Sequence, residues 1–177
     1  MCGIELLLGI ELNILDVSGR VDLDQKLLRQ MDISIASLHV PLFAPRSMEE
    51  NTAAYVNAMK NPYVDIIGHP DDRRYPLDYE ALVKAAKEHH VVLEVNESSL
   101  RPGNSRMDAT EFDVQMLKYC RQYRVPVVVG SDAHIDTDVG NHSYAQALFQ
   151  EMDFPEELVL NRSVEELKKY VNKYKGK

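Results

Sequence analysis

Short apolar runs alternate with helical patterns along the chain, and this alternation constrains the fold more than any other feature. The runs lie at residues 5–8, 34–38, 64–67, 91–95, 125–129 and 158–160. Between or after them, residues 24–30, 47–59, 77–89, 110–123, 143–152 and 163–174 have helical patterns or capping boxes. Alternating strands and helices predict an α/β fold with a parallel sheet, either open or closed into a barrel. Val127-Val128-Val129 does not alternate polar with apolar residues, so we expect both faces of the sheet to be covered.

Five of these runs have, at or just after their carboxyl ends, side chains that can act as metal ligands or as acids and bases. They are Glu11, His39, His69, Glu94 with Asn96, and Asp132 with His134. The carboxyl ends of parallel strands share one edge, where α/β enzymes place their chemistry. A single histidine at such a position is more often structural than a ligand, but three of the six histidines lie at these ends. Carboxylate and imidazole together suit zinc, manganese or iron.

The segment Gly130-Ser131-Asp132-Ala133-His134 is the most informative of these strand ends. Side chains alternate along extended backbone, so we expect Asp132 and His134 to lie on the same side. Two other polar loops follow predicted strands and are expected near the same edge of the sheet. Residues 71–74 form a charged run that we expect to be solvated. Arg106, in a long loop after the fourth run, is a candidate for contact with a phosphate group.

Composition narrows the class of protein. The 177 residues suit a single domain spanning residues 1–177. The 20 basic and 28 acidic residues give a net charge of −8, which argues against a broad nucleic-acid-binding surface. Cys2 and Cys120 are too few for a disulfide framework, so we expect a cytoplasmic protein. No apolar run approaches the ~18 residues of a membrane span.

The strand-end motifs, taken in order, resemble those of the PHP (polymerase and histidinol phosphatase) superfamily, and most of all its YcdX-like phosphatase branch. The motifs are Gly9-Ile10-Glu11-Leu12-Asn13-Ile14, Ser37-Leu38-His39, Ile67-Gly68-His69-Pro70-Asp71, Leu93-Glu94-Val95-Asn96 and Gly130-Ser131-Asp132-Ala133-His134. The resemblance implies a distorted (β/α)7 barrel with up to three divalent metals at its mouth. It also implies metal-assisted hydrolysis of a small phosphorylated substrate.

The resemblance also implies a role for each strand-end residue. Glu11 would bridge two metals, and His39 and His69 would complete the ligands of one of them. Asp132 would bind the other metal, and His134 would hold a third. Zinc or manganese fits these ligands, and iron is also compatible. Such metals would lower the pKa of bound water and clamp phosphate oxygens.

The beginning of the chain departs from the family pattern. Family members carry a His-x-His and two further histidines before the Gly-x-Glu-x-Asn motif, which here begins at Gly9. We therefore expect an N-terminally truncated chain with an incomplete barrel that lacks at least one β-α unit. Only the site of Glu11, His39 and His69 would keep all its protein ligands, so we expect about one tightly bound metal and poor or absent hydrolysis. The open barrel edge is expected to pair with another copy of the chain.

Two function classes remain open at this stage. The first is a metal-dependent phosphoesterase that uses metal-activated water. The second is a non-catalytic PHP-like domain kept for assembly or stability. A third candidate, an amidohydrolase barrel, usually places a carboxylated lysine at a strand end, and no lysine of this chain lies at one.

Overall fold

A parallel five-stranded sheet forms the centre of the computed structural model, which describes residues 4–106 and 109–175. The strands are β1 (Gly9–Asn13), β2 (Ile33–Ser37), β3 (Ile66–Ile67), β4 (Val92–Asn96) and β5 (Val127–Gly130). Each strand pairs in parallel with the next one along the chain, so all their carboxyl ends lie at one edge. The predicted α/β class with a parallel sheet is confirmed, and its closure into a barrel stays a prediction.

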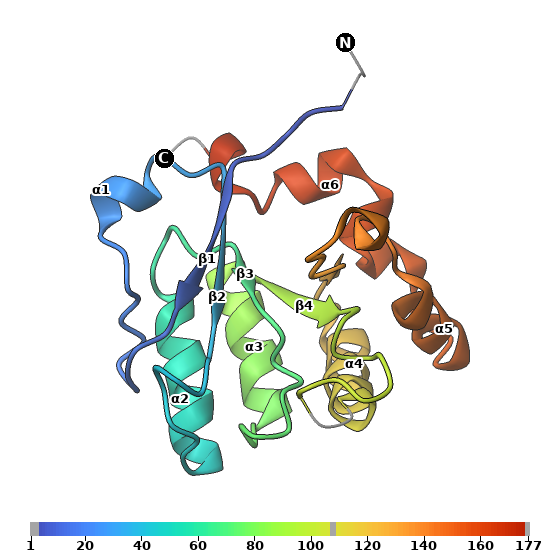
Figure 1. Ribbon diagram of the computed structural model, residues 1–177, viewed down its shortest axis with the longest axis horizontal. Helices are drawn as coiled ribbons and strands as arrows, with labels where there is room; N and C mark the ends of the chain where they lie inside the picture. Colours follow the sequence, from blue (N-terminus) through green and yellow to red (C-terminus); the bar gives the residue numbers. More distant parts are fainter. Residues whose placement is uncertain (1–3, 107–108, 176–177) are drawn as a thin grey trace.

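The first four helices connect successive strands, and the last two follow β5. They are α1 (Gln25–Leu28), α2 (Met48–Met59), α3 (Tyr79–His89), α4 (Thr110–Tyr123), α5 (Ser143–Glu151) and α6 (Val164–Lys168), with short 3-10 turns at Asp136–Asp138, Glu156–Leu158, Leu160–Arg162 and Asn172–Tyr174. The Ser47 side chain accepts a hydrogen bond from the Glu50 backbone at the start of α2, as its capping-box spacing predicts. Figure 1 shows α2, α3 and α4 side by side along the sheet. No helix in the described ranges is long and apolar enough to cross a membrane.

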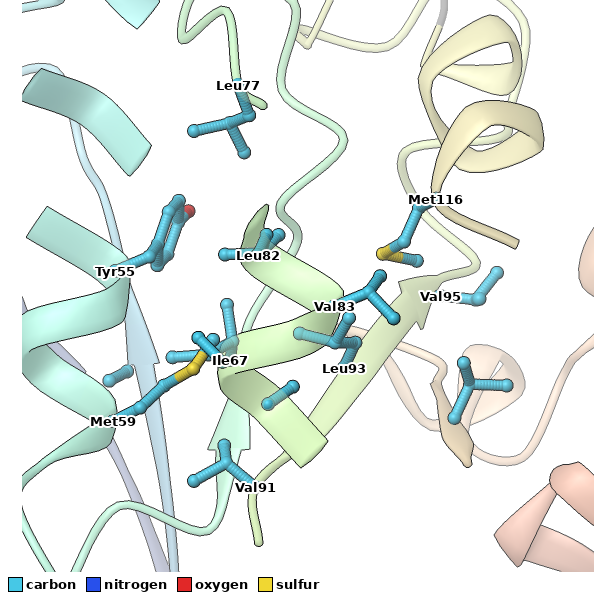
Figure 2. Close-up of a cluster of buried hydrophobic side chains, with 14 of the residues drawn as sticks. Tyr55, Met59, Ile67, Leu77, Leu82, Val83, Val91, Leu93, Val95 and Met116 are labelled. Carbon is cyan, nitrogen blue, oxygen red and sulfur yellow. The ribbon is translucent and has the colours of Figure 1, made fainter. Parts of the chain in front are cut away.

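The main hydrophobic core lies between this row of helices and the sheet. In Figure 2, Leu82 and Val83 of α3 lie near Leu93 of β4, with Met59 of α2 and Met116 of α4 to either side. All five side chains are almost completely buried. Burial of a side chain of this size contributes about 1.5–3 kcal/mol relative to its exposure.

A second, smaller cluster covers the opposite face of the sheet near the amino ends of the strands. It contains Ile66, Val92 and Leu160, and partly buried Leu167 and Tyr170 pack against it. Ile67 and Leu93, the next residues on β3 and β4, belong to the main core instead. Strand residues thus alternate between two apolar clusters, and every residue of β4 is buried. The expected burial of both faces is confirmed for β3 and β4, whereas in β5 Val128 is only partly buried.

Both ends of the strand series differ from the sequence prediction. Residues 5–8 are not a strand, because β2 begins at Ile33 and pairs first with Gly9. Glu5 in that segment instead forms an ion pair with Lys173 at 3.1 Å. The predicted strand 158–160 falls in two 3-10 turns, where Val159 forms a single parallel bridge to Val127. The predicted helix 163–174 is shorter and ends at Lys168.

The charged segment after β3 is not the solvated loop that its composition predicts. Asp71 and Asp72 are both buried. The Arg74 side chain compensates the Asp72 carboxylate with hydrogen bonds of 2.8 Å and 3.1 Å from Nε and a third from Nη2. This pairing therefore compensates the burial of the Asp72 carboxylate.

Candidate metal centre

Three side chains from successive strand ends meet in one place: Glu11 of β1, His39 after β2 and His69 after β3. The Nε2 atoms of His39 and His69 lie 3.3 Å and 3.2 Å from Glu11 Oε1, and 3.3 Å from each other. Across residues 4–106 and 109–175, this is the one group of at least three His, Cys, Asp or Glu side chains whose ligand atoms all lie within 4.8 Å. Two imidazole nitrogens and a carboxylate suit a divalent transition metal. We call these three residues the Glu11 group.

Neighbouring polar side chains fix the orientation of the Glu11 group. His39 Nδ1 donates to Asn13 Oδ1 at 2.7 Å, which leaves Nε2 directed at Glu11. This arrangement is typical of metal-binding histidines, whose second ring nitrogen is held by an oxygen acceptor. Ser37 Oγ donates to Glu11 Oε1 at 2.8 Å. Hydrogen bonds from His39 and His69, and then from Ser37, lower the pKa of Glu11 well below its usual value, so its carboxylate is ionised as a ligand requires.

A glycine before His69 makes room for this arrangement. A Cβ on Gly68 would lie 2.3 Å from Ser37 Oγ, the atom that bonds Glu11. His69 itself has a φ of +29°, in the region that non-glycine residues rarely adopt. Its side chain is only 3% exposed, and its ring centroid lies 5.1 Å from that of His39. The carboxyl end of β3 is therefore shaped to direct one buried imidazole into the Glu11 group.

Asp132 and His134 lie apart from the Glu11 group. Asp132 Oδ2 accepts from Asn96 Nδ2 at 3.3 Å and pairs with Arg106 Nη2 at 3.2 Å. The side chain of His134 is 85% exposed, and its Nδ1 donates to the backbone oxygen of Asp132 at 2.9 Å. The alternation that predicted a shared side stops here, because β5 ends at Gly130 and Asp132 has a φ of +48°.

Arg106 is anchored at the same edge of the sheet. Its guanidinium donates to Asn96 Oδ1 at 3.2 Å and Ser99 Oγ at 2.9 Å, in addition to its pair with Asp132. The side chain is only 16% exposed, so these contacts hold it firmly. We call Asp132, Asn96 and Arg106 the Asp132 group, in which a protein cation already neutralises the carboxylate.

Three buried carboxyl groups lie behind these sites: Asp71, Glu94 and Asp113. Burial raises the pKa of Glu94, and it raises the pKa of Asp71 to about 6. Burial, and then the neighbouring Asp71 and Glu94, raise the pKa of Asp113 well above its ordinary value. The sequence contains a signal for Asp113, because it precedes Met116, Leu117 and Cys120 at helical spacing and so lies on the apolar face of α4.

Comparisons with known proteins identify the family. A family model described as PHP-associated matches residues 115–158. A probable phosphatase of Clostridium novyi is 41% identical over 175 residues, which cover 99% of this chain and 70% of the relative. The chain belongs to the PHP superfamily. A probable phosphatase of Caldanaerobacter subterraneus is 46% identical over 96% of this PHP chain and 66% of the relative. The PHP chain thus spans about two thirds of the length of these relatives, and its predicted truncation stays a prediction.

One solved structure shows the same fold at low sequence identity. A chain in the cryo-EM structure of archaeal ribonuclease P with mature tRNA aligns with a TM-score of 0.59 and 20% identity. The alignment covers 98% of the PHP chain and 68% of the other chain. At this identity the likeness concerns the fold alone.

Proposed function

We propose that this chain carries the metal-binding part of a metal-dependent phosphoesterase. The observation that carries the proposal is the convergence of Glu11 Oε1 with the Nε2 atoms of His39 and His69. These atoms would hold one divalent ion, either zinc or manganese, with iron also compatible. The relatives named probable phosphatases support a phosphorylated substrate. When bound, such an ion activates water and stabilises the charge that develops on phosphoryl oxygens.

The protein side chains around the ion would position the substrate. Arg106 presents a fixed guanidinium at the same edge of the sheet, where its fork-shaped donors suit phosphate oxygens. Asp132 and His134 would serve further metal positions, as the family resemblance implies. In this chain Asp132 is held by Arg106 instead, and His134 is exposed. We therefore expect these positions to bind metal poorly.

We further propose that the sheet is an arc of a distorted (β/α)7 barrel within a single cytoplasmic domain. Strand pairing in chain order supports this, as does the row of helices α2, α3 and α4 along the sheet. In this arrangement β1 and β5 stand at the ends of the strand order. Val159 and Asn161 cover part of the outer edge of β5, so the outer edge of β1 is the one that would allow two copies of the chain to associate. Light scattering at high protein concentration tests for this association, and a chain that stays monomeric would contradict it.

Metal analysis tests the central part of the proposal. The chain is stripped with a chelator, reloaded with zinc or manganese, dialysed and analysed by mass spectrometry. We expect about one ion per chain, because only one set of three protein ligands converges. His39→Ala should lose that ion and His142→Ala should keep it. A wild-type chain that retains no metal ion, or one that holds three ions tightly, would contradict the proposal.

A second function is favoured by the state of the Asp132 group. The pairing of Asp132 with Arg106 suits a non-catalytic PHP-like domain that binds one ion for stability. An assay with a generic phosphomonoester and added manganese separates the two functions. Hydrolysis that disappears in His39→Ala supports the phosphoesterase, whereas no turnover by a chain holding one ion supports the non-catalytic domain.

A further inference from the structure

Glu94 on β4 is buried at the point where the two groups of the candidate site adjoin. Its Oε2 accepts a hydrogen bond from the backbone N–H of His69 at 2.8 Å. We propose that Glu94 is a positioning residue that holds the backbone of His69 in the conformation directing its imidazole at Glu11 and His39. This inference rests on the proposed metal site of the Glu11 group.

The backbone of His69 requires such support. Its φ of +29° places Cβ close to the backbone. Residues other than glycine keep such a conformation only when surrounding contacts hold them in it. Glu94 accepts a hydrogen bond from the buried N–H of His69, and this contact restrains the backbone there. Without it, this N–H would lose its partner and the left-handed conformation would lose a restraint. The imidazole of His69 would then move relative to Glu11.

The opposite strand is built to admit the Glu94 carboxylate. A Cβ on Gly130 of β5 would clash with Glu94 Oε1, because it would lie closer to that atom than Cβ atoms approach other atoms in proteins. Gly68 has the same relation to Ser37, whose hydroxyl it leaves free to bond Glu11. Glycine therefore makes room at two strand ends for a polar side chain from a neighbouring strand. In both cases that side chain contacts a member of the Glu11 group.

Glu94 also connects the Glu11 group to the Asp132 group. Asn96 Nδ2 donates to Glu94 Oε2 and to Asp132 Oδ2, both at 3.3 Å. A displacement of Glu94 would therefore disturb both groups. Glu94 itself is not one of the converging ligands in the described part of the chain, so its contribution is made through the residues it contacts.

Glu97 provides a matched control in the same segment. It is as fully buried as Glu94, but its carboxylate accepts from the backbone N–H groups of Tyr144 and Ala145 at the start of α5. Loss of this carboxylate removes a buried negative charge and its hydrogen bonds without affecting His69. Glu97→Ala therefore reports the purely structural cost of such a change.

The experiment measures cobalt and zinc affinity by chelator competition, the visible spectrum of bound cobalt, and thermal unfolding of the metal-free chain. We expect Glu94→Ala to weaken metal affinity by about tenfold or more, as removal of groups that orient metal ligands typically does. Glu94→Gln keeps an oxygen acceptor for the His69 N–H and should stay within about threefold of wild type. Glu97→Ala should lower the unfolding temperature while leaving metal affinity and the cobalt spectrum unchanged.

Gly130→Ala supplies an independent route to the same change. Its added Cβ should displace Glu94 and reduce metal affinity as Glu94→Ala does. The atoms nearest to that Cβ all belong to Glu94, so the effect on His69 would be indirect. The double variant Glu94→Ala, Gly130→Ala should be no worse than Glu94→Ala alone, because the clashing carboxylate is gone. If Glu94→Ala does not fold, the difference between Glu94→Gln and Gly130→Ala decides the question in the same way.

Three results would overturn the inference, and they are distinguishable. Unchanged affinity in folded Glu94→Ala and Gly130→Ala overturns the positioning role while the proposed metal site stands. Equal losses in Glu94→Ala and Glu97→Ala show a structural effect alone. A wild-type chain that binds no metal refutes the proposed function itself, and the inference with it.

Discussion

The Glu11 group and the Asp132 group each place a carboxylate at the same edge of one sheet, yet they differ in what that carboxylate contacts. In the Glu11 group, ligand atoms from three strand ends lie within 3.3 Å of each other and aim at a common point. In the Asp132 group, a guanidinium occupies the place beside the carboxylate. Ligand residues in the expected order therefore do not by themselves make a metal site, because each must be free to face the others.

Removal of a histidine from the Glu11 group should have the largest effect. His69→Ala takes away one of three ligands and should weaken zinc binding by more than about 100-fold, measured by calorimetry or chelator competition. His134→Ala is the matched control on the other side, and it should leave this affinity unchanged because its side chain is exposed. Equal losses in the two variants would contradict the contrast between the groups.

Arg106→Ala should reveal what the guanidinium does in the Asp132 group. We expect inorganic phosphate to bind the zinc-loaded variant about tenfold more weakly, because a fixed bidentate donor is lost. Arg101→Ala is the control, since Arg101 lies in the same loop and pairs with Asp138 instead. Phosphate titration followed by calorimetry measures both. Unchanged phosphate affinity in Arg106→Ala would show that Arg106 only neutralises Asp132.

Asp113→Asn should change how the stability of the metal-free chain depends on pH. The raised pKa of Asp113 means that the fold favours its protonated form. The stability that this form provides is present below about pH 4 and is lost as the pH rises through the folded pKa. The variant should therefore be more stable than wild type at pH 8, by about 1 kcal/mol or more, and nearly equal to it at pH 4.

Urea unfolding at both pH values measures this change. Glu111→Gln, an exposed substitution on the same helix, should leave the pH dependence as it is in wild type. We expect wild type to lose stability relative to Asp113→Asn as the pH rises from 4 to 8. If the difference between the two chains stays constant, the expected effect of the buried carboxyl is refuted.

Ser37→Ala should have the smallest effect. It removes one hydrogen bond to Glu11 Oε1 without removing a ligand, so metal affinity should fall by about threefold. Ser34→Ala, a buried serine on the same strand that does not contact Glu11, is the control. A loss as large as that of His69→Ala would mean that the hydroxyl matters more than the geometry indicates.

The sequence predicted the strand ends well because each depends on local pattern. Apolar runs placed β2 to β5, and the residues just after them identified the Glu11 group. It failed where distant residues decide the outcome. Residues 6–8 are apolar but lie opposite no residue of β2, so they do not extend β1. Burial of Asp72 depends on its ion pair with Arg74, and burial of Asp71 depends on the packing around it.

The role of Glu94 was hidden for the same reason. Its position at a strand end was visible in the sequence, but its contact with the His69 backbone spans 25 residues. The space it occupies depends on Gly130, another 36 residues along the chain. Only the pairing of β3, β4 and β5 brings these three residues together. The positive φ of Asp132, which ends the strand alternation, is likewise not encoded in the apolar pattern.

Anomalous diffraction from crystals of the chain grown with zinc would show which side chains bind the metal. We predict one strong zinc peak bonded to Glu11 and to the Nε2 atoms of His39 and His69, with Asp132 still paired with Arg106. A zinc peak held by Asp132 and His134, with none between Glu11 and the two imidazoles, would contradict metal binding by the Glu11 group.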